Sequence, residues 1–171
     1  MLFPPFVSHP ARLTSDCYVG RFRHFLTACT YKRRLYFRDV ALVGHVRTHF
    51  LRTAMQESIE ILAYCFMPDH LHLLVTGATE NADVRRFIRL AKQLSGYEFH
   101  QHRQTSLWQP SYFDRALRGE DDTEAVVAYI VANPVRAQLV ERADDYPFWG
   151  SDKYTRQEIL EFVQTHSSRW A

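Results

Sequence analysis

Two apolar runs in the middle of the chain follow one another with only two residues between them. Residues 59–67 and 70–75 are rich in branched and aromatic side chains, and Pro68 and Asp69 separate them. Apolar runs bounded by turn residues indicate strands, and so short a connection joins antiparallel neighbours. The sequence therefore predicts a β-hairpin at residues 59–75.

Further elements are predicted on both sides of this hairpin. Residues 22–30 alternate as a strand does, and apolar residues recur at helical spacing through 39–55 and 81–100. Residues 107–117 predict an irregular strand, with Pro110 at an edge or a bulge. The order of elements predicts an α+β fold, a ferredoxin-like sandwich in which helices pack on a mostly antiparallel sheet.

The last third of the chain predicts two more helices. Asp121 and Glu124 form a capping-box pattern before an apolar helix over 125–133, and Pro134 ends that helix because the residue before a proline avoids helical angles. The segments expected after it are a helical turn at 136–140, a loop at 144–150 and a terminal helix at 155–165.

The helix over 81–100 is predicted to be amphipathic, with a basic outer face. The residues expected to point inward are Val84, Phe87, Ile88, Ala91 and Leu94, and those expected to point outward are Arg85, Arg86, Arg89 and Lys92. His100 and His102 follow in a polar run, and we expect both to be solvated residues without a role.

Size and composition favour one folded domain. The chain has 171 residues, of which 46% are hydrophobic and 23% charged, as in globular proteins. No apolar run is long enough to cross a membrane, and prolines interrupt the apolar start, which lacks the basic residues of a secretory signal. Three cysteines without a CxxC spacing indicate neither a disulfide framework nor a cysteine zinc site. We expect a cytoplasmic protein.

Charge is distributed unevenly along the chain. The formal net charge is only +2, but residues 21–53 hold eight basic side chains and one acid, which gives +7. Aromatic residues alternate with these cations. Such a region is typical of a phosphate-backbone partner, where cations supply affinity and rings stack on bases. The alternative is an ordinary solvated surface.

The strand at 70–75 carries two histidines two residues apart. Side chains two apart on a strand point to the same face, so His70 and His72 project together. Two imidazoles form half of a site for a divalent ion, and a third ligand must come from elsewhere. A chance pair of half-buried histidines is the alternative interpretation.

The predicted helix at 125–133 offers a nucleophile and a further ligand. Tyr129 and Asn133 are four residues apart and share one face. A phenol is a weak nucleophile at neutral pH unless a metal, a base or cationic surroundings favour the phenolate. The alternative is that Tyr129 is a core aromatic and Asn133 a C-terminal cap.

Taken together, the chain resembles the single-tyrosine transposases with a His-hydrophobe-His motif, and most closely their REP-associated tyrosine transposase branch. Four blocks carry the resemblance: the strand and basic turn at 20–37, the histidine motif at 64–75, the segment at 107–114, and the tyrosine block at 129–137. Two departures concern turns, because the family often has glycine where Gln138 stands and a serine pair where Gly150 and Ser151 stand.

This resemblance implies a single-stranded DNA endonuclease and strand-transferase. By carry-over, Tyr129 is the nucleophile, His70 and His72 are metal ligands, Asn133 is the third ligand, and the ion is Mg²⁺ or Mn²⁺. Attack on phosphorus would give a 5′-phosphotyrosine enzyme and a free 3′-hydroxyl. The whole chain would be one transposase-like domain, divided into an N-terminal extension (1–17), a family-like core (18–151) and a C-terminal helix (152–171).

The resemblance also implies a partner, the imperfect hairpin of a repetitive extragenic palindrome (REP). The candidate DNA-binding residues are Arg21, Arg23, Lys32, Arg33, Arg34, Arg85, Arg86, Arg89 and Lys92. Relatives place the tyrosine helix in their own subunit or in a partner's, so a homodimer stays open, although we expect a monomer. A transposase would work on DNA at the nucleoid.

Two other functions stay open at this point. A domesticated DNA-binding protein would keep the fold and the basic surface without cleavage. A metal-dependent nuclease would use a bound water, with Tyr129 merely orienting the phosphate.

Overall fold

The computed structural model describes residues 15–119 and 121–167. One antiparallel sheet runs through the middle of the molecule, with its strands in the order β4-β1-β3-β2-β5. The strands are β1 (Arg23–Cys29), β2 (Ile59–Met67), β3 (His70–Gly77), β4 (Phe113–Ala116) and β5 (Trp149–Gly150). The predicted hairpin is β2 and β3, and it forms the centre of the sheet.

Two helices connect the strands across one face of the sheet. Helix α1 (Val40–Gln56) joins β1 to β2, and α2 (Val84–Arg103) joins β3 to β4. Strand β3 lies between β1 and β2, and β1 lies between β3 and β4. Two interlocked split βαβ units of this kind define the ferredoxin-like arrangement. The predicted α+β sandwich is confirmed.

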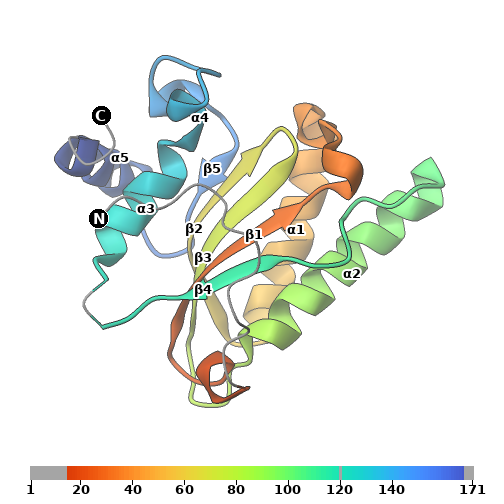
Figure 1. Cartoon of the computed structure of the whole chain (residues 1–171), viewed down its shortest axis with the longest axis horizontal. Coiled ribbons are helices and arrows are strands. Elements are labelled where there is room, and N and C mark those ends of the chain that lie inside the picture. Colours follow the sequence, from red (N-terminus) through yellow and green to blue (C-terminus); the bar gives the residue numbers. More distant parts are fainter. Residues whose placement is uncertain (1–14, 120, 168–171) are drawn as a thin grey trace.

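The C-terminal third covers the opposite face. Helices α3 (Thr123–Val131), α4 (Asn133–Arg136) and α5 (Arg156–His166) lie across the sheet from α1 and α2 (Figure 1). Since side chains alternate along a strand, each layer has its own core. Leu26 and Leu73 pack toward α1 and α2, whereas Phe25 and Leu74 pack toward α3 and α5. His70 and His72 share the second face with Leu74.

Aspartates cap three of the helices that cover the sheet. The side chains of Asp39, Asp83 and Asp122 accept hydrogen bonds from backbone N–H groups in the first turns of α1, α2 and α3, which satisfies donors that a helix leaves unpaired. The predicted cap of α3 was therefore wrong by one residue. Asp121 instead accepts from the Arg118 N–H at 2.7 Å, in the turn that precedes the helix.

The chain after α3 departs most from expectation. Helix α3 ends at Val131, and Pro134 lies in the first turn of α4, where its missing N–H costs nothing. The helical turn predicted at 136–140 was therefore wrong, and the segment predicted as a loop at 144–150 starts in a 3₁₀ turn (Ala143–Asp145) and ends in β5. Gln138 has a φ of 57°, in the left-handed region that favours glycine. The terminal helix was confirmed, and a Thr155–Glu158 capping box starts it.

Short single-turn helices complete the described part of the chain. The 3₁₀ turns are η1 (Ser15–Tyr18), η2 (Tyr31–Arg33), η3 (Tyr36–Arg38) and η4 (Ala143–Asp145). Two of the predicted segments lie partly outside the described residues. The predicted N-terminal extension falls outside the described residues up to residue 14, and the C-terminal segment does so from residue 168.

Helix α2 does not present all of the predicted face to solvent. Lys92 was expected to point outward, but it is buried, and its Nζ donates to the backbone carbonyls of Gln109 and Ser111 at 2.9 and 2.8 Å. Leu94, expected inward, is 44% exposed. The cause is the segment before β4, which folds back over α2 and covers Lys92. Trp108 of that segment is also buried.

Candidate active site

The two predicted ligands meet on β3. His70 and His72 point to the same side of the strand, and their Nε2 atoms lie 3.0 Å apart. The rings meet edge to face with their centroids 4.5 Å apart. His72 is almost completely buried and His70 partly so. The histidines therefore converge through one nitrogen each, as two ligands of one ion do.

Neighbouring side chains hold the other nitrogen of each ring. The Nδ1 of His70 lies 2.6 Å from the Asp69 Oδ1, and the Nδ1 of His72 lies 2.9 Å from the Thr27 Oγ1. Arg33 forms an ion pair with the second oxygen of Asp69 at 2.8 Å. Because a hydrogen bond at Nδ1 fixes the ring and its tautomer, Asp69 and Thr27 direct both Nε2 atoms toward one point.

The residues present fit a small divalent cation. An ion held octahedrally at bonds of about 2.1 Å spaces adjacent ligand atoms about 3.0 Å apart, and the two Nε2 atoms have this separation. Burial lowers the pKa of His70, and burial together with the charges of His70, Arg33 and Arg136 lowers that of His72 well below its ordinary range. Both rings are therefore neutral near pH 7, the form that binds metals.

Tyr129 approaches this pair from α3. Phe25 of β1 links them, because its ring stacks on His72 with centroids 5.3 Å apart and meets Tyr129 edge-on at 6.3 Å. The Arg136 guanidinium lies over the Tyr129 ring, 4.4 Å from its centroid. The phenol is partly exposed. A potential nucleophile, a cation and the histidine pair thus share one face of the sheet.

Asn133 lies one turn after Tyr129, where α3 passes into α4. Its Nδ2 donates to the carbonyl oxygens of Tyr129 and Ile130 at 2.9 and 3.2 Å. The amide therefore caps the C-terminus of α3, as the alternative interpretation expected. The cap uses the nitrogen and leaves Oδ1 as the atom that suits a cation.

Comparison with known proteins identifies the family. The model of the IS200-like transposases matches residues 19–133, which include the histidine motif, Tyr129 and Asn133. The chain belongs to the IS200-like transposase family. The predicted resemblance to the transposases is confirmed, and with it the prediction that the protein is an enzyme.

Individual proteins similar to this chain are named REP-associated tyrosine transposases. It is 27% identical to a REP-associated tyrosine transposase of Haemophilus influenzae over 130 residues, which are 68% of this chain and 73% of the relative. It is 28% identical to the Escherichia coli K12 REP-associated tyrosine transposase over 104 residues, 60% of this chain and 61% of the relative. The structure of a REP-associated tyrosine transposase bound to a REP hairpin aligns with a TM-score of 0.69 and 23% identity, covering 84% of this chain and 82% of that one.

The predicted DNA-binding cations fall into separate groups in this transposase. Arg33 lies beside the histidine pair through Asp69, and Lys32 and Arg34 flank it in the exposed loop after β1. Arg21 forms an exposed ion pair with Glu80. Arg23 bonds to Thr123 and to the Arg118 and Asp121 carbonyls, so it anchors the start of α3.

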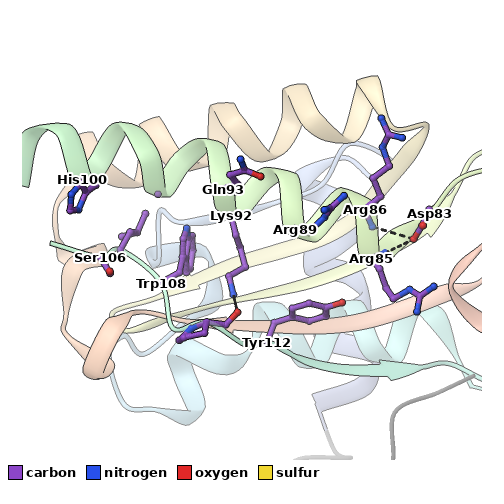
Figure 2. Close-up of a pocket in the computed structure, with 13 residues that line it drawn as sticks. Asp83, Arg85, Arg86, Arg89, Lys92, Gln93, His100, Ser106, Trp108 and Tyr112 are labelled. Carbon is purple, nitrogen blue, oxygen red and sulfur yellow. Dashed lines mark hydrogen bonds between the residues drawn. The ribbon is translucent and has the colours of Figure 1, made fainter. Parts of the chain in front are cut away.

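The remaining cations line a groove beside α2. Figure 2 shows Arg85, Arg86 and Arg89 along one side of it and Tyr112 opposite, with Lys92 reaching across to the backbone. The groove has a volume of about 760 Å³. Arg86 also pairs with Glu57, and Arg85 lies over the Tyr18 ring. This groove is on the α2 side of the sheet, away from His70 and His72.

The sequence did not reveal three residues that complete the histidine site. Asp69 adjoins His70 in the chain, and this acid next to a ligand histidine was an available signal. Thr27 faces His72 because the two are register partners across β1 and β3, which requires the strand pairing. Arg136 reaches Tyr129 because α4 turns back against α3. Among the described residues, no helix combines the length and the apolar character that a membrane span requires.

Proposed function

We propose that this transposase is a metal-dependent single-stranded DNA endonuclease and strand-transferase that acts on hairpin-flanked DNA through a 5′-phosphotyrosine at Tyr129. The observation that carries the proposal is the convergence of the His70 and His72 Nε2 atoms at 3.0 Å beside a helix that carries a tyrosine. Membership of the transposase family supports it.

His70 and His72 would hold the metal, with Asn133 as third ligand through Oδ1. Mg²⁺ and Mn²⁺ suit this mixture of nitrogen and oxygen donors at an open site, and imidazole favours Mn²⁺. When bound, the ion would polarise the scissile phosphate and orient it for attack. Asp69 and Thr27 would keep the ligand nitrogens aimed at it.

The chemistry of the chain itself is a phosphodiester exchange. The Tyr129 oxygen forms a bond to phosphorus and loses its proton to solvent, while the bond from phosphorus to the 3′-oxygen breaks and that oxygen takes up a proton. One phosphodiester replaces another, so a free 3′-hydroxyl can reverse the step without ATP. Arg136, over the Tyr129 ring, would stabilise the phenolate and the charge on the phosphate.

The DNA partner would be a strand with a hairpin. The similar structure named above is bound to a REP hairpin. Here the basic groove beside α2 would hold backbone phosphates through Arg85, Arg86 and Arg89, and Arg33 would guide the unpaired strand to the histidine pair. Lys92 would contribute less, since its ammonium already bonds to three carbonyls.

A monomer would suffice for this reaction. The α3 helix of the chain packs on the chain's own sheet, and Tyr129 touches Phe25 of β1. In a monomer, the nucleophile and the histidines would come from one subunit. A chromosomal DNA substrate would place the enzyme at the nucleoid, within the cytoplasm.

The test is capture of the covalent intermediate. The protein and its Tyr129→Phe variant are incubated with Mn²⁺ or Mg²⁺ and a pool of hairpin-flanked single strands labelled at both ends, then separated on denaturing gels. We expect a metal-dependent adduct joined to the 3′ portion of the DNA, and loss of both the adduct and cleavage in the variant, because phenylalanine lacks the attacking oxygen.

Other outcomes would contradict the proposal in distinct ways. Cleavage without an adduct, equal in Tyr129→Phe, would indicate a nuclease that uses water. Binding without cleavage across the pool and both metals would indicate a DNA-binding protein. Tyr154→Phe is the matched control, because this tyrosine packs in the same helical layer against Phe162, and it should retain the adduct.

A further inference from the structure

A second cluster of metal-binding side chains lies on the other side of the sheet, between α1 and α2. His45 and His49 are one turn apart on α1, and Glu98 of α2 faces both. One ligand atom from each residue can be chosen so that all three lie within 4.8 Å of one another. Among the described residues, this is the only group of three histidine, cysteine or acidic side chains that meets this criterion.

The contacts between each histidine and Glu98 are close to the ligand spacing of a tetrahedral ion. A zinc ion bound at about 2.0–2.1 Å separates adjacent ligand atoms by about 3.3 Å. The His49 Nε2 lies 3.1 Å from one Glu98 oxygen, and the His45 Nδ1 lies 3.5 Å from the other. The two imidazole rings meet edge to face at 4.6 Å. The three groups, whose ligand atoms lie within 4.8 Å of one another, would draw together around a bound ion.

Hydrogen bonding alone leaves this cluster incompletely satisfied. At 3.5 Å, the contact between the His45 Nδ1 and Glu98 is too long for a well-formed hydrogen bond. The other ring nitrogen of His45, Nε2, is buried without a partner among the described residues. The Nδ1 of His45 faces Glu98, and a neutral imidazole can bind a metal through this atom.

A fourth donor lies on the same helix as Glu98. His102 follows Glu98 by one turn on α2 and, like Glu98, is exposed. The prediction that His102 lies beyond the end of its helix was wrong, because α2 continues to Arg103. His102 is therefore a candidate for the fourth ligand, as is water.

We propose that His45, His49 and Glu98 form a zinc site that joins α1 to α2, with His102 or water as the fourth ligand. Two imidazoles and a carboxylate are ligands that Zn²⁺ takes in tetrahedral sites, whereas Mg²⁺ prefers octahedral surroundings rich in oxygen. The i, i+4 histidine pair facing an acid of a neighbouring helix builds the site on rigid elements. Its role is to stabilise the helical layer, since the proposed phosphoryl transfer takes place on the opposite face.

The experiment separates this site from the one at His70 and His72. Tag-free His70→Ala/His72→Ala protein, which lacks the first site, is dialysed against Zn²⁺, and bound metal is counted. We expect about one zinc per chain, and a rise in melting temperature of about 5–10 °C at a free zinc concentration of 100 times Kd. Adding His49→Ala or Glu98→Gln should abolish both effects, whereas Mg²⁺ should produce neither.

Controls make the result specific. His100→Ala is the matched control, because this α2 histidine bonds to the Thr105 carbonyl and not to the cluster, so it should keep the zinc. If the double-alanine background does not fold, Co²⁺ absorption of the otherwise unchanged chain replaces it: His49→Ala should remove a tetrahedral spectrum. Zinc retained in His49→Ala and Glu98→Gln, or lost equally in His100→Ala, would overturn the proposal. Neither result depends on DNA cleavage.

Discussion

At the scale of single residues, some side chains of this transposase act by orienting their neighbours. Asp69 and Thr27 touch no reacting atom in the proposed mechanism, yet their oxygens fix the two rings whose Nε2 atoms converge. Arg33 in turn neutralises Asp69. Partners of this kind typically change metal affinity by about 10–100-fold when they are altered.

Asp69→Asn should therefore lower the affinity for the metal ion without preventing DNA binding. Asparagine retains an oxygen for the His70 ring but loses the charge that strengthens the bond and pairs with Arg33. We expect the Mn²⁺ concentration for half-maximal cleavage to rise about 10-fold, measured by metal titration at saturating DNA. Asp144→Asn, which alters an exposed carboxylate paired with Arg156, is the matched control. An equal change in both variants would refute the positioning role.

At the scale of elements, α3 carries the proposed nucleophile on a short helix. It has nine residues, and its apolar side chains fill the second core. Isolated helices of this length are unstable in water, so the packing against β2 and β3 and the Asp122 cap must hold it in place. The position of Tyr129 thus depends on both ends of the helix, with Asn133 capping the other end.

Removing the first cap should destabilise the protein measurably. Asp122→Ala leaves the Glu124 and Ala125 N–H groups without their acceptor, and we expect a loss of about 1 kcal/mol in the free energy of unfolding. Urea titration measures it. Asp122→Asn should be nearly neutral, because asparagine caps as well as aspartate. A similar loss in Asp122→Asn would assign the effect to charge, including the nearby His166, and not to the cap.

At the scale of the whole molecule, helices cover both faces of the sheet, and histidines on its strands are therefore buried. Burial lowers the pKa of His24 and is the largest of the causes that lower that of His72. Unfolding exposes them and returns each pKa to about 6.5, so the unfolded chain binds protons that the native chain does not. Stability must therefore fall as pH decreases below about 6.5, and it is complete above that value.

The protein is therefore predicted to lose stability in mildly acidic solution. Each of these two histidines contributes up to about 1.4 kcal/mol per pH unit below 6.5, and metal-free protein should unfold at lower urea concentration at pH 5.5 than at pH 7.5. His24→Gln, which does not titrate, should reduce the difference, whereas the exposed His102→Gln should retain most of it. Equal stability at the two pH values would show that neither histidine resists protonation.

Local patterns were sufficient to predict the central hairpin, the main helices and the histidine pair. Strand alternation places His70 and His72 on one face whatever the strand packs against, and four ordered motif blocks identified the family. Helix periodicity likewise placed Val84, Phe87 and Ile88 inward, as observed. These features depend on residues that are close in sequence, because the repeat of a strand or a helix alone decides which side chains share a face.

Tertiary structure decided what depends on distant partners. Lys92 is buried because the segment before β4 folds over α2, and Thr27 orients His72 because β1 pairs with β3 in one register. The two-residue β5 exists only as a partner for β2. His49 and Glu98 meet because α1 packs on α2. The sequence determines which faces and motifs the chain carries, whereas strand register and helix packing decide which side chains meet, since these follow from the free energy of the whole fold.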